Sequence, residues 1–87
     1  MENNYKITIS VLGNEWSEEG KTIHSTLDKF PLTWEQIKSK GVVVVTKGNL
    51  KRTQLIPGVT LRRILSNKIM KAVWSKRLKL LLEADKK

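Results

Sequence analysis

Four consecutive valines at positions 42–45 constrain the fold more than any other feature of this chain. Branching at Cβ restricts the first side-chain torsion and disfavours a helix, whereas valine packs well on a pleated sheet. Because the run is apolar at every position, we predict a strand that is buried on both faces. A polar turn follows at residues 46–49, and residues 50–56 are predicted to return as the second strand of a hairpin.

The N-terminal region carries another strand signal. Residues 5–12 alternate apolar and polar side chains, which is the period of two that is typical of a half-buried strand. Its apolar members are Tyr5, Ile7, Ile9 and Val11. We predict an acidic loop over residues 13–20 that a glycine closes, and a threonine-rich strand over residues 21–27 that pairs back on the first strand.

Two regions are predicted to be helical. The first covers residues 33–40, where Thr33 fits the N-cap, Gln36 its capping-box partner and Gly41 the left-handed position after the helix. The second begins after the Pro-Gly pair at positions 57–58, where the apolar residues take up a helical period.

The C-terminal helical region contains Ser66 and Asn67, both good N-cap residues. It is therefore either one long helix with a polar position or two helices with a capped break. On the N-terminal side of this pair, one face is formed by Leu61, Ile64 and Leu65.

Residues 68–82 carry an apolar stripe on one side of the helix and lysines on the other. The stripe consists of Ile69, Met70, Val73, Trp74, Leu80 and Leu81, and the opposite cluster of Lys68, Lys71 and Lys79. We expect the stripe to pack on the inner face of the sheet, because a chain of 87 residues has few other sources of core.

Together these segments predict a small single α+β domain over residues 1–87, in the order β-β-α-β-β-α, with residues 1–4 and 84–87 frayed. A long C-terminal amphipathic helix, continuous or broken near Ser66 and Asn67, packs on an antiparallel sheet. The sequence has no apolar run of the roughly 20 residues that a membrane span needs. It also has no secretory leader and no cysteine, so we expect a cytoplasmic protein without disulfides.

The net charge of +9 is unevenly distributed. Residues 1–40 carry five basic and six acidic side chains, whereas residues 41–87 carry twelve basic and two acidic ones. A concentration of positive charge attracts and steers a polyanion, and nucleic acid is the commonest such partner. An acidic surface on another protein would attract the same side chains.

The candidate phosphate-binding residues lie in the basic half. They are Lys47, Lys51 and Arg52 near the hairpin tip, Arg62 and Arg63 early in the helical region, and Lys68, Lys71 and Lys79 on the last helix. Arginine and lysine supply charge-assisted donors to phosphate. The alternative interpretation is that the lysines only protect an edge strand and that the arginines only face solvent.

We therefore predict a small basic nucleic-acid-binding protein. DNA is favoured over RNA, because the sparse aromatic residues form no stacking platform on neighbouring strands. Non-enzymatic action is expected, without a cofactor or metal, because His24 is the only histidine and the scattered glycines form no phosphate-binding loop.

The alternative function is a protein-interaction module. Trp16 lies in the acidic segment where no core pattern requires it, so it is a candidate anchor for a protein partner, unless it folds back over the hairpin. Such a module would be an inhibitor or adaptor that docks its basic face on an acidic surface of a larger protein. The small size also suits a protein encoded by a virus or mobile element.

Overall fold

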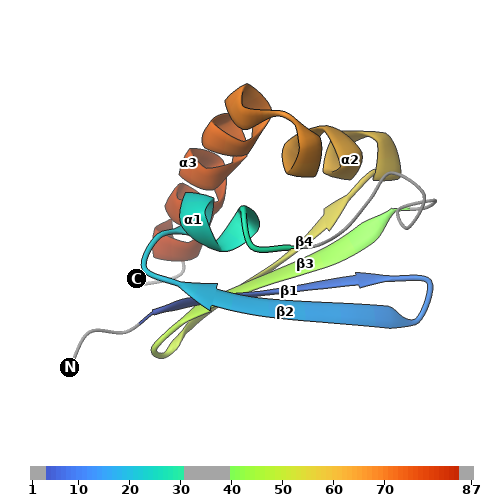
Figure 1. Cartoon of the computed structure of the whole chain (residues 1–87). Helices are drawn as coiled ribbons and strands as arrows, with labels where there is room; N and C mark the ends of the chain where they lie inside the picture. Colours follow the sequence, from blue (N-terminus) through green and yellow to red (C-terminus); the bar gives the residue numbers. More distant parts are fainter. Residues whose placement is uncertain (1–3, 31–39, 85–87) are drawn as a thin grey trace.

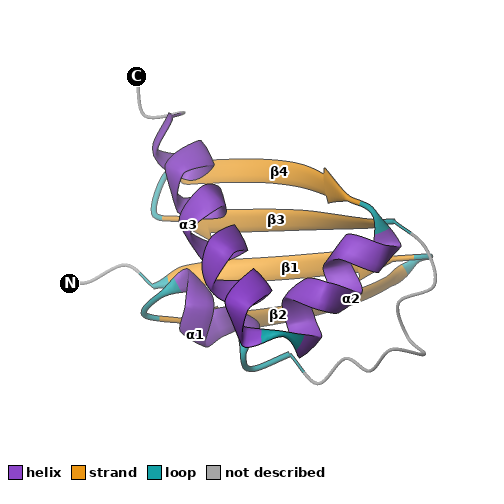
Figure 2. Ribbon diagram, turned by 90° about the horizontal axis from the view of Figure 1, so that it is seen from above, coloured by secondary structure: helices purple, strands orange, loops and turns teal. Residues whose placement is uncertain are grey.

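The computed structural model describes residues 4–30 and 40–84 as one antiparallel four-stranded sheet with three helices on one of its faces (Figures 1 and 2). In chain order the elements are β1 (Tyr5–Val11), β2 (Asn14–Gly20), α1 (Ile23–Leu27), β3 (Gly41–Lys47), β4 (Leu50–Ile56), α2 (Gly58–Ser66) and α3 (Lys68–Ala84). The strand order is β2-β1-β3-β4. This confirms the predicted α+β class, the antiparallel sheet and the packing of the C-terminal helix on it.

The two strands predicted from the clearest patterns, β1 and β3, lie at the centre of the sheet. Their register places Ile7 opposite Val45 and Ile9 opposite Val43, and all four side chains are buried beneath the helices. Val44 points to the other face of the sheet and is only half-buried. The prediction that the valine run is buried on both faces is therefore wrong, because the described helices cover one face alone (Figure 1).

Residues 14–20 form β2 and not the predicted loop. This strand pairs with β1 along its whole length, and Trp16 and Glu18 on its helix-facing side are half-buried. A cross-strand hydrogen bond joins the hydroxyls of Thr8 and Ser17 at 2.9 Å. Glutamate has low strand propensity, but pairing with a well-formed neighbour overrides it.

The turn between β1 and β2 contains only Leu12 and Gly13, with φ values of 50° and 83°. Positive φ at both positions is characteristic of a type I′ hairpin turn, whose right-handed twist matches that of the strands. Leucine is a poor residue for this turn, since the left-handed conformation brings its Cβ too close to the backbone.

Replacing Leu12 by asparagine is expected to raise the free energy of unfolding by about 0.5–1 kcal/mol, because asparagine tolerates the left-handed conformation. Leu12 is exposed, so no core packing is lost. Chemical denaturation measures the change. Leu12→Ala is the control, since it removes the exposed side chain but keeps the unfavourable backbone; an equal gain in that variant would contradict the explanation.

Residues 23–27 form helix α1, so the strand predicted over residues 21–27 is wrong. Thr22 and Ser25 make a capping box: the Ser25 N–H donates to the Thr22 hydroxyl at 3.0 Å, and the Thr22 N–H donates to the Ser25 hydroxyl at 3.3 Å. Ile23 and Leu27, four residues apart, are both buried. The capping signal was present in the sequence, but the threonine content favoured a strand.

The C-terminal region is two helices with a capped break. The Asn67 side-chain oxygen accepts hydrogen bonds from the N–H groups of Ile69 at 2.9 Å and Met70 at 3.2 Å, which starts α3. Leu61 and Ile64 of α2 are buried as predicted. Residues 33–39 of the helix predicted over residues 33–40 lie outside the described residues, as do most of the residues predicted to fray.

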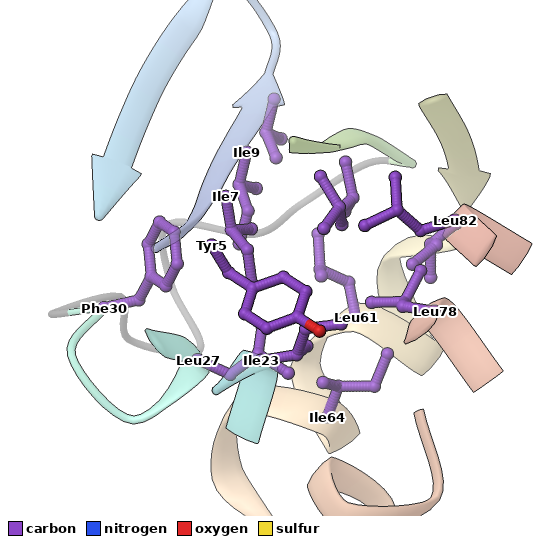
Figure 3. Close-up of a cluster of buried hydrophobic side chains, with 14 residues drawn as sticks. Tyr5, Ile7, Ile9, Ile23, Leu27, Phe30, Leu61, Ile64, Leu78 and Leu82 are labelled. Atoms are coloured by element: carbon purple, nitrogen blue, oxygen red, sulfur yellow. The ribbon is translucent and has the colours of Figure 1, made fainter. Parts of the chain in front are cut away.

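The predicted inner face of α3 is wrong for three of its six residues, whereas Trp74 packs against the core and Met70 and Leu81 are half-buried. Ile69, Val73 and Leu80 are 75%, 50% and 60% exposed, whereas Leu78 and Leu82 are buried. Because α3 is apolar on two sides, its sequence fits either orientation; the break at Asn67 and the packing of α3 against α1 and α2 decide which side faces inward. Figure 3 shows Leu78 and Leu82 together in the buried cluster, with residues of β1, α1 and α2.

Candidate nucleic-acid interface

Cationic side chains from separate parts of the chain meet around a hollow of about 310 Å³ between α1, α3 and the end of the sheet at which β1 begins. We call this the cationic hollow. Its basic lining residues are Lys21 and His24 at the start of α1, Lys47 at the end of β3, and Lys76 and Lys79 on α3. Among the described residues that line it there is no carboxylate.

The antiparallel sheet explains why these segments meet. β1 begins where both of its neighbours end, so Tyr5 lies near Gly20 and Lys47. The Lys47 ammonium lies 4.6 Å from the centre of the Tyr5 ring, a cation–π contact that fixes the lysine at the edge of the hollow. α1 follows β2 closely in the chain, and α3 passes over this end of the sheet (Figure 2).

A second hollow of about 340 Å³ adjoins the first and shares Tyr5 and Lys47 with it. The turn between β3 and β4 and the end of α3 form its other walls, which include Glu83. This carboxylate makes the second hollow less attractive to an anion. The cationic hollow is therefore the stronger candidate for phosphate.

Lys47 and Lys79 are the only two of the eight predicted phosphate-binding residues that line the cationic hollow. The hairpin residues diverge: Lys51 lies opposite Thr46 on the open face of the sheet, whereas Arg52 lies opposite Val45 on the helix-covered face. This follows from the alternation of side chains along a strand. The three cations therefore do not act as one cluster.

Lys71 is buried and makes an ion pair. Its ammonium donates to the Asp28 carboxylate at 2.5 Å, and only 7% of the residue is exposed. The hydrogen bond from Lys71 is the main cause that holds the pKa of Asp28 below its usual value of 3.8, and the nearby charges of His24 and Lys68 act in the same direction. The charge of Lys71 is thus neutralised inside the molecule, and its ammonium is not available to phosphate.

The helical arginines lie elsewhere. α2 begins at the end of β4 that is remote from the β3–β4 turn, so Arg62 and Arg63 do not line the cationic hollow (Figure 2). Arg63 is exposed, and Arg62 is half-buried. Lys68, at the first position of α3, is also exposed outside the hollow.

Sequence reasoning missed Lys21, His24 and Lys76. Lys21 belongs to the charge-balanced N-terminal half, and His24 fell in a wrongly predicted strand. Lys76 is 55 positions from Lys21 in the sequence, and no local pattern connects them. Only the tertiary fold brings these residues together.

Trp16 lies in a strand, so the prediction that it lies in a loop is wrong. It lies in β2 directly opposite Ile9, on the helix-covered face, and packs against the core. A half-buried indole has less surface to offer a partner than the sequence indicated.

Within residues 4–30 and 40–84, no group of three or more histidine, cysteine, aspartate or glutamate side chains could hold a metal ion. None of the helices in those residues is long and apolar enough to span a membrane. Comparisons with protein-family models, curated proteins and solved structures found no match to this chain. The fold and its surface define a small basic α+β domain whose described helices cover one face of a four-stranded antiparallel sheet.

Proposed function

We propose that this chain is a small, non-enzymatic nucleic-acid-binding protein that contacts phosphates through the cationic hollow. The observation that carries the proposal is the convergence of Lys21, Lys47, Lys76 and Lys79 on one hollow without a described carboxylate. Like charges gathered in this way repel one another, and a bound polyanion relieves the repulsion. The net charge of +9 would also speed the encounter with a polyanion.

Duplex DNA is the proposed ligand in preference to RNA. Single-stranded RNA is usually bound by exposed aromatic rings on which bases stack. Among the described aromatic residues, Tyr5 is buried, and the Trp74 ring is covered by the Arg77 guanidinium, whose central carbon lies 4.8 Å from the ring centre. Lysines bind phosphate as point charges and read no base, so the proposed binding depends little on sequence. Arg63 and Lys68 are proposed as outlying contacts.

The salt dependence of DNA binding tests the proposal. If the four lysines each neutralise one phosphate, the slope of log K against log salt should be near −3.6 for duplex DNA. Each single change to alanine at Lys21, Lys47, Lys76 or Lys79 should make the slope shallower by about 0.9. Fluorescence anisotropy with a labelled duplex at several salt concentrations measures both quantities.

Lys51→Ala provides the matched control. Lys51 is an exposed lysine on the opposite face of the sheet, so its removal lowers the net charge equally but should leave the slope unchanged. If no duplex or single-stranded probe binds below roughly 100 μM at low salt, the nucleic-acid proposal fails. If Lys51→Ala changes the slope as much as Lys79→Ala does, the cationic hollow is not the site.

A protein-interaction module is the second candidate function. It is favoured by the exposed aliphatic side chains Ile69, Val73 and Leu80 on α3, which contribute nothing to phosphate binding.

A further inference from the structure

The outer face of α3 is apolar although the core does not need it. Leu78 and Leu82 already anchor the inner face of the helix in the core. The outer face exposes 75% of Ile69, 50% of Val73 and 60% of Leu80. A helix that only covers a sheet needs one apolar side, so the second side calls for another explanation.

These three side chains form a narrow seam. At about 100° per residue, Ile69, Val73 and Leu80 fall within an arc of about 40°. Their spacings of four and seven residues are those of the seam by which one helix packs along another. Helices that lie in a membrane surface present a broader apolar face, frequently with tryptophan or phenylalanine. The shape of the seam therefore favours a helix as its occupant.

The charges beside the seam restrict the kind of helix. Lys76 occupies the seam position between Val73 and Leu80, and Arg77 and Lys79 flank the seam on its two sides. All three are exposed. A second copy of this chain would place like charges against these cations, which disfavours self-association. A helix with carboxylates beside its own apolar seam would complement them.

We propose that the outer face of α3 docks an acidic amphipathic helix of a protein partner. Aliphatic side chains of the partner pack on Ile69, Val73 and Leu80, and its carboxylates pair with Lys76, Arg77 and Lys79. The apolar contacts supply affinity, and the charge pairs set which helices are accepted. This interface shares Lys76 and Lys79 with the cationic hollow, so the partner helix and DNA are expected to compete for these two cations. The three apolar seam residues carry no charge and contribute only to binding of the helix.

A designed peptide tests this surface. The probe is a fluorescein-labelled helical peptide of four heptads, with leucine or isoleucine at its seam positions and glutamate on both flanks. Mutual repulsion of the glutamates keeps it from pairing with itself. The first comparison peptide has the same seam with lysine flanks, and the second is a scrambled peptide of the same composition. We expect only the unscrambled, glutamate-flanked peptide to bind, as measured by anisotropy.

The chain offers a matched pair of double variants. The test variant combines Val73→Ser with Leu80→Ser, and the control combines Val59→Ser with Leu55→Ser, whose side chains are 57% and 54% exposed away from α3. We expect the test variant to weaken binding of the glutamate-flanked peptide at least tenfold and the control to change it less than twofold. Both variants should melt close to the unmodified chain and keep its affinity for duplex DNA.

Four results would overturn the proposal. They are no binding of the glutamate-flanked peptide at 100 μM, equal binding of the scrambled peptide, equal weakening by the control variant, and equal binding of the lysine-flanked peptide. Two further measurements identify a different occupant. If the unmodified chain binds vesicles of anionic lipid, and the test variant loses that binding but still binds the peptide, the seam binds membrane and the proposal is wrong. If sedimentation shows a dimer of the chain that the test variant dissociates, a second copy covers the seam.

Discussion

Leu78→Ala is expected to lower the free energy of unfolding by about 2–5 kcal/mol, whereas Leu80→Ala should change it by less than about 0.5 kcal/mol. The two leucines are two positions apart on α3, but Leu78 is 2% exposed and Leu80 is 60% exposed. Truncation of Leu78 removes apolar surface from the buried cluster and leaves a cavity (Figure 3). Truncation of Leu80 removes a side chain that water already surrounds.

Thermal and chemical denaturation of both variants measure the difference. In a domain of this size, 1 kcal/mol shifts the melting temperature by about 4–8 °C, so Leu78→Ala should melt at least about 8 °C below the unmodified chain. Leu80→Ala should stay within a few degrees of it. If the two effects were reversed, α3 would present the opposite face to the sheet.

The Lys71–Asp28 ion pair gives the second large effect on stability. Asp28→Asn should lower the free energy of unfolding by about 1–2 kcal/mol, because it leaves the buried ammonium of Lys71 without a counter-charge. This value is below that of a fully buried pair, since the Asp28 side chain is about half exposed to solvent. Lys71→Met should be close to neutral, because it replaces the buried charge with an apolar side chain of similar length.

The pH dependence has a defined sign. The pKa of Asp28 is lower in the folded chain than its usual value of 3.8, chiefly through the hydrogen bond from Lys71. The unfolded chain therefore binds a proton more readily at this site than the folded chain does. The stabilisation is complete above about pH 4 and is lost as the pH falls through the folded pKa.

Urea denaturation between pH 2 and pH 7 tests this sign. The stability difference between the unmodified chain and Asp28→Asn should shrink as the pH falls below about 4. Glu15→Gln is the control for the loss of one surface carboxylate, and its serine hydrogen bond can persist because the amide oxygen still accepts. A difference between the unmodified chain and Asp28→Asn that stays constant down to pH 2 would contradict a stabilising role for the Asp28 charge.

Local patterns predicted the central elements correctly. The alternation in β1 and the valines of β3 each indicate a strand without reference to the rest of the chain. Branching at Cβ and the two-residue alternation of apolar and polar side chains are local properties that a few residues define. The β3–β4 hairpin and the buried face of α2 followed for the same reason. The proposal that Asn67 caps a break was one of two open alternatives, and its side-chain hydrogen bonds to Ile69 and Met70 resolve it.

The region of residues 14–27 was misread because its local preferences are weak. Glutamates in β2 disfavour a strand, and α1 is only five residues long with Thr26 in its interior, where threonine has low helix propensity. Pairing with β1 and burial of Ile23 and Leu27 outweigh these preferences. Contacts distant in sequence contribute more here than the propensity of any single residue.

For the candidate site, the order of the residues along the chain is enough to show that the positive charge lies mainly in residues 41–87, and it pointed to Lys47 and Lys79. The three-dimensional fold is needed to see that Lys21 and Lys76 join them in the cationic hollow and that Asp28 neutralises Lys71, because these residues are far apart in the sequence. The orientation of α3 is likewise set by tertiary packing, because the helix is apolar on two sides and its sequence pattern fits either orientation. The choice between its faces depends on the sheet and helices against which it packs, and that information is distributed over the whole chain.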